Sequence, residues 1–368
     1  MNISDWGWEY APIDNAIEKQ RADLIPARVV EQQRRQYTLR CGPEADVLVA
    51  SVSGAFRHRA AGPADYPTLG DWVFVEKSSK RIAEVLPRRT AVIRSSAGDE
   101  SVEQVIAANI DVLFLVFALD NERGFTEGLL ERLLVVAETS GARPVVVLNK
   151  ADTVSPDAGA RTSDRASRLA RGVNVHLVSA RTRENTDALL NEAKPGETIA
   201  LLGKSGVGKS ALVNTLETKN NAHDIGGNTP DVESGASPTL AREGEVRAWR
   251  NQGRHTTTDK RLYRLSSGIL VADVPGLREV QLWGDDDTLA ASFADITGMA
   301  GECRFSDCSH SGEPGCRILQ ALATGELCHD RYSRYLDYCQ EIAHLGRRRE
   351  KRRRSGKSSK SGRDKRRR

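Results

Sequence analysis

The sequence predicts a multidomain chain with an N-terminal β-barrel of the OB-fold type, a central α/β domain and a C-terminal, mainly helical domain. Three observations predict this order. Short alternating strands separated by glycine and proline fill residues 25–94. Continuous apolar strands alternate with amphipathic segments over 95–284. Three cysteines and a histidine lie close together inside 285–345. Residues 1–24 are expected to be a loose tail, and 346–368 a disordered basic tail.

Composition limits the class of protein. A chain of 368 residues predicts two or three domains. Apolar residues make up 39%, and no run of about eighteen apolar residues exists, so a membrane span is excluded. The first residues lack an apolar core, so a secretory signal is not expected. Six cysteines are too few for a disulfide scaffold, which favours a cytoplasmic location.

The charge is distributed unevenly. Residues 346–368 contain fourteen Lys or Arg and two acids, a sum of +12, whereas the whole chain has a net charge of +4. The rest of the chain therefore has a charge of −8. Dense arginine without acidic compensation predicts contact with nucleic-acid phosphates. The alternative is a disordered end that only improves solubility.

The first folded segment has the pattern of a small antiparallel barrel. Residues 28–30 and 36–39 predict a hairpin. Strands 47–50, 71–75 and 81–86 follow, and Gly-Pro pairs mark the turns. Such barrels often bind nucleic acid, although this is an analogy of fold.

From residue 95 the pattern changes to alternating strands and helices, which predicts a doubly wound sheet with helices on both faces. The expected strands are 111–117, 144–148, 173–178, 198–202, 262–265 and 269–272. The expected helices are 126–140, 163–171, 183–193 and one that begins at Lys209.

A phosphate-binding loop follows the strand at 198–202. Its residues match the Walker A pattern and lead into a helix. Backbone N–H groups of such a loop surround phosphate oxygens, and the helix N-terminus adds a favourable dipole. Lys209 would neutralise the outer phosphates, and the Ser210 hydroxyl would ligate Mg²⁺. The expected nucleotide contacts here are Gly203, Lys204, Ser205, Gly206, Val207, Gly208, Lys209, Ser210 and Ala211.

The base is predicted from Asn149–Lys150–Ala151–Asp152, directly after an apolar strand. The Asp152 carboxylate can accept two hydrogen bonds from guanine, and adenine lacks that donor pair. Asn149 would bind the other edge of the base, and the Lys150 stem would pack over the ring. After the next strand, Ser179 and Ala180 offer a backbone N–H to the guanine oxygen. These segments favour GTP over ATP.

The order of the motifs predicts a circular permutation. Asp273–Val274–Pro275–Gly276 fits the Asp-x-x-Gly pattern, in which Asp273 holds Mg²⁺ through a water and the Gly276 N–H senses the γ-phosphate. In most GTPases the phosphate loop comes first, but here the base-binding segments precede it. The loop after Asp273 then leads directly into the C-terminal domain.

The water-activating group is predicted in the polar segment 217–260. Leu277 stands where many GTPases have a glutamine that orients water, so a substitute is needed. Thr257 is expected to bind Mg²⁺ and the γ-phosphate. His255 is expected to orient the water, with Arg254 as an alternative charge stabiliser.

Cys303, Cys308, His310 and Cys316 predict a closed, structural Zn²⁺ site, because three thiolates and one imidazole leave no open position. The alternative is that these are free buried cysteines. Cys328 with His329 is a competing ligand pair of second choice.

These residues together resemble the family of ribosome small-subunit-dependent GTPase A. The resemblance covers residues 25–345, and it depends on the permuted motifs, the segment 253–258, the Cys/His cluster and the segment 89–100. It implies a bacterial, cytoplasmic GTPase that assists late maturation of the small ribosomal subunit and is stimulated by the ribosome. It also implies that His255 is catalytic. The long arginine-rich tail departs from the family pattern.

Three hypotheses follow. The first is a Mg²⁺-dependent GTPase that binds the small ribosomal subunit and its rRNA, is released after hydrolysis to GDP, contacts no membrane and is a monomer. The second is an RNA-binding chaperone that uses GTP only as a structural ligand. The third is a GTPase that signals through a protein partner, with a tail that only solubilises.

Overall fold

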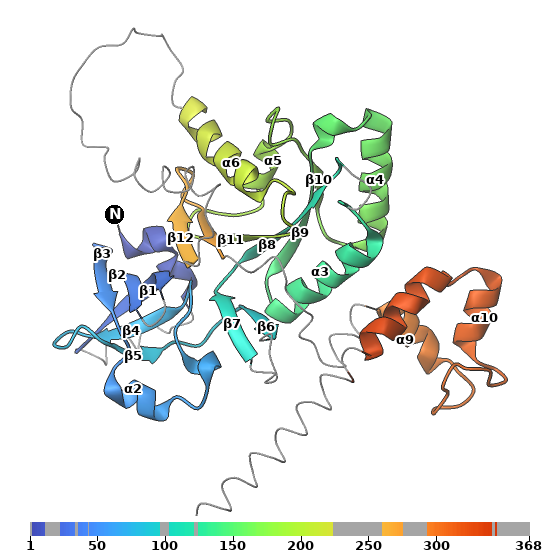
Figure 1. Cartoon of the computed structure of the whole chain (residues 1–368), viewed down its shortest axis with the longest axis horizontal. Coiled ribbons are helices and arrows are strands. Elements are labelled where there is room, and N and C mark those ends of the chain that lie inside the picture. Colours follow the sequence, from blue (N-terminus) through green and yellow to red (C-terminus); the bar gives the residue numbers. More distant parts are fainter. Residues whose placement is uncertain are drawn as a thin grey trace, which may run out of the picture. The chain divides into compact units, whose positions relative to one another are not determined.

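The computed structural model divides into two compact units (Figure 1). Unit 1 comprises Met1–Arg94 and Gln104–Val280, and unit 2 comprises Ser95–Glu103 and Gln281–Arg368. The residues that the structure describes are 2–11, 23–33, 36–42, 44–95, 103–120, 124–223, 260–274, 293–340 and 343. Among these, no helix is long and apolar enough to cross a membrane.

Five antiparallel strands form the N-terminal barrel. They are β1 (Leu24–Gln33), β2 (Gln36–Cys41), β3 (Asp46–Ala50), β4 (Trp72–Glu76) and β5 (Ile82–Val85). The predicted hairpin is β1–β2, and β1 also pairs with β4. Alternate side chains such as Val29, Leu39 and Val73 are fully buried in one core, as the period of a half-buried strand requires. Short helices α2 (Gly54–Arg59) and η3 (Pro63–Asp65) connect β3 to β4.

The N-terminal residues differ from expectation. Residues 2–11, expected to be part of a loose tail, instead form the 3-10 helices η1 (Ile3–Trp6) and η2 (Trp8–Tyr10). Trp6 is 1% exposed, and the Arg40 guanidinium lies 4.8 Å from its ring centroid. Trp8 packs edge-on against Trp72 of β4 at 4.9 Å. Burial of these large aromatic rings outweighs the cost of ordering a polar segment.

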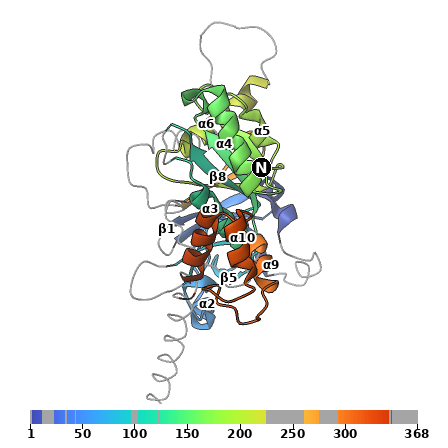
Figure 2. The same ribbon diagram turned by 90° about the vertical axis from the view of Figure 1, so that its right-hand side faces the viewer.

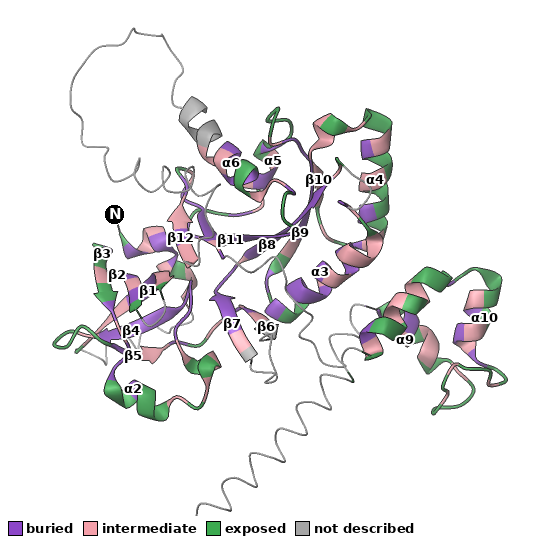
Figure 3. Ribbon diagram, in the orientation of Figure 1, coloured by how far each residue is buried: buried purple, intermediate pink, exposed green. Residues whose placement is uncertain are grey.

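The central sheet has the predicted parallel strands in the order β10-β9-β8-β11-β13. Their bounds are Val175–Leu177 (β10), Arg143–Asn149 (β9), Val112–Ala118 (β8), Thr198–Leu202 (β11) and Leu270–Asp273 (β13). All seven residues of β8 are buried, because helices cover both faces of this strand (Figure 3).

Helices cover both faces, as a doubly wound fold requires. Leu113 and Phe117 of β8 pack on the side of α3 (Glu127–Ser140) and α4 (Pro156–Leu169), which Figure 2 shows in front of the sheet. Phe114 and Val116 pack on the side of α5 (Asp187–Leu190) and α6 (Lys209–His223). The alternation of β8 side chains therefore fills two cores with one strand.

Two helices differ from their predicted bounds for local reasons. The α4 helix begins earlier, because Ser155 caps it by accepting the Ala158 N–H and Pro156 occupies the first turn. The α5 helix has four residues rather than the expected 183–193. Arg183 and Asn185 adopt positive φ angles of 63° and 55°, which interrupt a helix.

The barrel and the central sheet are hydrogen-bonded into one sheet. Strand β12 (Lys260–Arg264) is antiparallel to β13 on one side and to β1 on the other, where Arg261 pairs with Glu31. The path of strands therefore runs from β10 through β12 to β3. Strands β6 (Ala91–Ser95) and β7 (Glu103–Ala108) form a separate two-stranded sheet.

A buried arginine reinforces this junction. Arg28 of β1 is 2% exposed and lies 5.0 Å from the ring centroid of Trp72. Its guanidinium donates to the carbonyl of Trp6, to the carbonyl of Asn109 at 3.3 Å and to Thr198 Oγ1 at 2.7 Å. Desolvation lowers the pKa of Arg28 to about 10. The charge is tolerated because these acceptors replace water.

Unit 2 is mainly helical, as predicted. It contains α9 (Ala294–Gly301), α10 (Arg317–Thr324) and a helix at 329–340. Phe293 is fully buried against Tyr335 and Tyr338. Arg331 forms a two-pronged ion pair with Asp295, with both distances at 2.8 Å, and so joins the last helix to α9.

Candidate nucleotide site and metal centre

The predicted phosphate loop connects the end of β11 to the start of α6. Gly206 and Gly208 have φ angles of 83° and 97°, which favour glycine. A Cβ at Gly208 would also overlap the side-chain amide of Asn149. Val207, 4% exposed, anchors the loop in the core between these glycines.

The start of α6 provides the charged and hydroxyl groups. Lys209 Nζ donates to the carbonyls of Gly203 at 2.6 Å and Lys204 at 2.9 Å, so its ammonium lies across the loop. Ser210 and Ala211 follow in the exposed first turn. A 15-residue helix whose N-terminal N–H groups face this loop favours an anion there.

Asn149 joins three loops. It is the last residue of β9 and is 1% exposed. Its Nδ2 donates to the carbonyl of Val207 at 2.8 Å, and its Oδ1 accepts the Ala180 N–H at 3.0 Å. The base-binding segment, the phosphate loop and the Ser179–Ala180 segment are thus tied together by one amide.

Asp152 lies in the 3-10 helix η4 (Ala151–Thr153) after β9. Its Oδ1 accepts the Ser179 hydroxyl at 2.5 Å, and its Oδ2 accepts Arg181 Nε at 2.8 Å. The hydrogen bond from Ser179 outweighs desolvation and, with the charge of Arg181, holds the pKa of this carboxyl below its usual value. Asp152 is therefore an ionised acceptor.

The backbone groups around Ser179 form more hydrogen bonds than the sequence indicated. The Ser179 N–H donates to the carbonyl of Glu184 at 3.1 Å, and the Ala180 N–H is bound by Asn149. Thr215 of α6, which sequence reasoning missed, donates to the carbonyl of Ala180 at 3.0 Å. Its only sequence signal is a polar residue on an otherwise apolar helix face.

Two further predicted residues lie near the same edge of the sheet. Lys150 has a φ of 65°, and its Nζ pairs with Asp120 at 2.5 Å after the end of β8. Asp273 is the last residue of β13, whose neighbour β11 leads into the phosphate loop. Three other predicted residues, His255, Thr257 and Gly276, lie outside the described residues, as do Arg254 and Leu277.

The predicted nucleotide-site residues that the structure describes lie at or after the carboxyl ends of parallel strands, where ligands bind in open α/β sheets. The phosphate loop follows β11, Asn149 ends β9, and Ser179 follows β10 by two residues. An anion-binding loop thus lies beside an ionised acceptor and a fixed amide. This arrangement can bind a nucleotide by its phosphates and its base.

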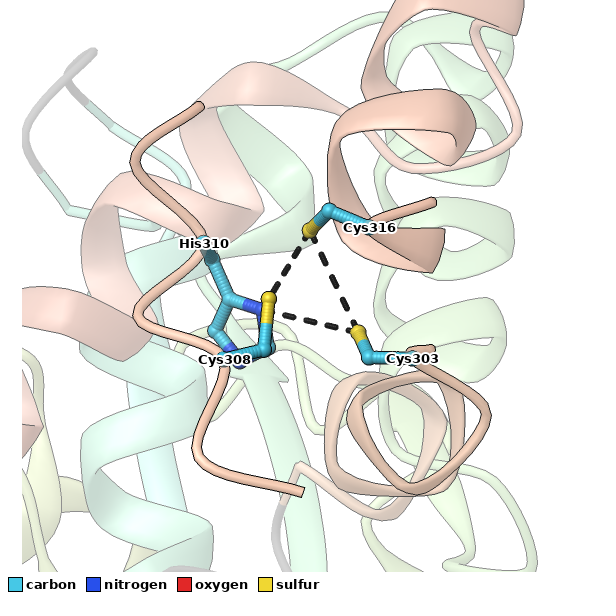
Figure 4. Close-up of side chains that lie close together, drawn as sticks. All are labelled: Cys303, Cys308, His310 and Cys316. Atoms are coloured by element: carbon cyan, nitrogen blue, oxygen red, sulfur yellow. Dashed lines mark hydrogen bonds between the residues drawn. The ribbon is translucent and has the colours of Figure 1, made fainter. Parts of the chain in front are cut away.

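The second cluster gathers Cys303, Cys308, His310 and Cys316 in unit 2 (Figure 4). Their ligand atoms all lie within 4.8 Å of one another. His310 Nδ1 is 3.6 Å from Cys303 Sγ and 3.4 Å from Cys316 Sγ, and these two sulfurs are 4.0 Å apart. Ligands on one tetrahedral zinc ion are separated by about 3.5–3.8 Å. The donor set and its size therefore fit a closed metal site, and Cys328 is exposed outside it.

The start of α10 supports this cluster. Cys316 is its N-cap, and its sulfur accepts the Leu319 N–H at 3.5 Å. Burial opposes ionisation of Cys303, but hydrogen bonds from the Arg317 and Ile318 N–H groups hold its pKa below the usual value. The helix N-terminus thus stabilises a thiolate, the form that binds metals.

Glu313 organises the loop that bears His310, a role sequence reasoning missed. Its carboxylate accepts the Ser309 N–H at 2.8 Å, the Ser309 hydroxyl, the Ser311 N–H at 2.8 Å and the Gly312 N–H at 3.1 Å. These bonds, first that from the Ser309 hydroxyl, lower the pKa of Glu313 to about 2. They surround His310, whose φ of 58° is uncommon for a residue with a side chain.

The fold and its first site define a class of protein. Along the chain, the Asn-Lys-x-Asp segment at the end of β9 comes first. The phosphate loop after β11 comes second, and the aspartate of the Asp-x-x-Gly motif, at the end of β13, comes last. This is a circularly permuted P-loop GTPase.

Residues 85–283 match the RsgA GTPase family, and the chain belongs to that family. It is thus a GTP-hydrolysing enzyme. It is 38% identical over 364 residues to the small ribosomal subunit biogenesis GTPase RsgA of Opitutus terrae, covering 95% of this chain and 92% of the relative. It is 37% identical to the protein of that name from Xylella fastidiosa strain M23, covering 92% of this chain and 95% of the relative.

Solved structures support the fold. The crystal structure of YjeQ from Thermotoga maritima superposes with a TM-score of 0.61 at 22% identity, covering 87% of this chain and 99% of the other. That of YloQ, described as a circularly permuted GTPase, has a TM-score of 0.58 at 23% identity and covers 88% and 97%. The multidomain, permuted fold predicted from the sequence is confirmed.

Proposed function

We propose that this GTPase acts in late maturation of the small ribosomal subunit, binds the subunit in its GTP state and leaves after hydrolysis. The observation that supports this most is the match over 95% of the chain to relatives named for small-subunit biogenesis. Subunits are then expected to stimulate hydrolysis. The permuted order adds a physical route, because the chain after Asp273 continues directly into unit 2.

In this proposal the nucleotide is held at both ends. Lys209 neutralises the outer phosphates, and the N–H groups of 203–211 surround them. Asp152 accepts the two guanine N–H donors, and the Lys150 stem packs over the ring. The guanine oxygen shares the Ala180 N–H, which already donates to Asn149, as a bifurcated bond.

Hydrolysis in this proposal depends on the segments next to the phosphate loop. Ser210 and Thr257 would hold Mg²⁺ directly, and Asp273 would hold it through water. The ion would neutralise charge on the phosphates. The Gly276 N–H would bind the γ-phosphate, and the imidazole of His255 would orient the attacking water.

The Cys/His cluster in this proposal holds one structural Zn²⁺. The three cysteine sulfurs, as thiolates, and the Nδ1 of His310 would hold the ion, and four protein ligands would leave no position for substrate. The ion would join α9, the 304–315 loop and α10, which together have few buried residues.

The proposed partners are the small ribosomal subunit and its rRNA. The +12 charge of residues 346–368 would contact phosphates, so binding weakens steeply with salt. We also propose domains at 25–94, 95–284 and 285–345, a monomeric state and a cytoplasmic location.

The test is GTP turnover with and without purified small ribosomal subunits, for wild type and His255→Ala. Stimulation of the wild type that the variant loses, at unchanged GTP affinity, supports the proposal. Equal stimulation of the wild type and His255→Ala would assign the water-orienting role to Arg254 or to a ribosomal group instead. No stimulation of the wild type would favour GTP as a structural ligand or a protein partner.

Deletion of residues 346–368 separates the remaining alternatives. If the tail contacts rRNA, the deletion weakens subunit binding and flattens its dependence on salt. If the tail only solubilises the protein, subunit binding is unchanged.

A further inference from the structure

The carboxylate of Asp152 has two partners from the segment that follows β10. Ser179 donates to Oδ1, and Arg181 Nε donates to Oδ2 at 2.8 Å. The Asp152 side chain is 8% exposed, whereas that of Arg181 is 78% exposed. Ser179 thus binds one carboxylate oxygen, and a largely exposed arginine side chain binds the other.

Arg181 and guanine offer this carboxylate the same chemistry. Guanine presents a ring N–H beside an exocyclic amine, and a guanidinium also presents adjacent planar N–H donors. Both satisfy a carboxylate best when they lie in its plane. The two donors therefore compete for Oδ2.

The loop backbone holds Arg181 beside Asp152. The Thr182 N–H donates to the Ser179 hydroxyl at 3.1 Å, and the Ser179 N–H donates to the carbonyl of Glu184. The carbonyl of Ala180 accepts Thr215 from α6. Residues on both sides of Arg181 are thus fixed, so only the arginine side chain needs to be ordered for the contact.

We propose that Arg181 is an affinity-determining residue that competes with guanine for Asp152 and so weakens the binding of both GDP and GTP. This inference rests on the proposed role of Asp152 in guanine recognition. Only protein in which Asp152 is not paired with Arg181 can accept the base, so the apparent Kd equals the intrinsic Kd divided by that unpaired fraction. This competition lowers the association rate of the nucleotide, because the Arg181–Asp152 pair must open before the base enters.

The expected size follows from the exposure of the pair. Exposed ion pairs shift equilibria by about two- to five-fold. Arg181→Ala should therefore tighten GDP and GTP binding by about that factor, through faster association at an unchanged dissociation rate. If Arg181 acted only through its positive charge, Arg181→Ala would instead weaken binding, because it removes a cation near an anionic nucleotide.

The experiment is stopped-flow binding of a fluorescent GDP to the full chain. Arg183→Ala is the matched control, since it removes the same charge from the same loop and Arg183 does not pair with Asp152. Tighter binding in Arg181→Ala, with Arg183→Ala at or above the wild-type Kd, supports the proposal. Unchanged or weaker binding in Arg181→Ala overturns it.

A separate variant distinguishes this inference from the proposed base site. Asp152→Asn should lose GDP and gain XDP, because xanthine replaces the amine of guanine with an oxygen that an amide can bind. If that exchange fails, Asp152 is not the guanine acceptor, and both proposals fail. If it succeeds while Arg181→Ala does not tighten binding, only the inference about Arg181 is wrong.

Discussion

Asn149 Nδ2 lies 2.8 Å from the carbonyl oxygen of Val207, so the end of β9 is hydrogen-bonded to the phosphate loop after β11. The same side chain accepts the Ala180 N–H with its other end. Both bonds are shielded from water, because Asn149 is 1% exposed. The three loops expected to contact a nucleotide are therefore held in one arrangement before any ligand binds.

Asn149→Ala should remove both bonds and leave the buried Val207 carbonyl unsatisfied, at about 1–3 kcal/mol, with a smaller cost at the partly buried Ala180 N–H. We expect GDP affinity to fall by about ten-fold or more, with a measurable loss of stability. Fluorescent GDP titration and urea unfolding check this. Asn174→Ala, at an exposed amide bonded to Glu192, is the control and should bind normally. Wild-type affinity in Asn149→Ala would contradict the role of this amide.

Thr215→Val tests the contact from α6. The change keeps the shape of the side chain but removes the donor to the Ala180 carbonyl. About 0.5–1.5 kcal/mol should be lost, seen as faster GDP dissociation of up to about ten-fold. Thr162→Val is the matched control: Thr215 and Thr162 both donate to a carbonyl four residues earlier on their helices, Ala211 and Ala158, but the hydroxyl of Thr162 is bonded within α4 alone. If both variants release GDP at the wild-type rate, Thr215 does not position Ala180.

Glu313→Gln tests the loop around His310. The neutral amide accepts the Ser309, Ser311 and Gly312 N–H groups less strongly than the carboxylate does. We expect metal affinity to fall by about 10- to 100-fold, as for other residues that orient metal ligands. Titration of the purified chain with Co²⁺, followed by its visible absorption, measures this. Glu326→Gln, at an exposed acid paired with Arg317, should leave the titration unchanged.

Arg28→Ala tests the buried junction. It leaves the carbonyls of Trp6 and Asn109 without their donor and removes packing on Trp72. We expect the free energy of unfolding of unit 1 to fall by about 3–5 kcal/mol. Urea unfolding followed by tryptophan fluorescence checks this. Arg57→Ala, at an exposed arginine on α2, should change it by less than about 0.5 kcal/mol.

Much of the fold could be predicted, because its signals are local in the sequence. The apolar run of β8, the glycines of the phosphate loop and the spacing of Cys303 to Cys316 each depend on neighbouring residues. The packing of Trp6 and the burial of Arg28 could not be predicted. Both depend on partners outside their own segments: Trp6 contacts Arg40, 34 residues away, and Arg28 contacts Trp72 and Thr198, 44 and 170 residues away.

In the candidate site too, residues within local motifs could be predicted, and residues that act through distant contacts could not. Residues expected to contact the nucleotide belong to motifs, so Asn149 and Asp152 could be proposed from the sequence alone. Residues that act on those groups from elsewhere, such as Thr215 and Arg181, match no motif, because any side chain with a suitable donor can make their contacts. Glu313 was missed for the same reason, although it lies beside the predicted metal ligands.

The pairing of β1 with β12 also affects how the chain can be made. Glu31 pairs with Arg261, 230 residues later, so during synthesis the C-terminal half of β1 has an open edge until nearly the whole of the GTPase domain has left the exit tunnel. An open strand edge is a template for pairing with other chains. The strands of the barrel and those of the central sheet are therefore joined late in synthesis. A nascent chain halted before β12 would expose the edge of β1 that β12 covers in the folded protein.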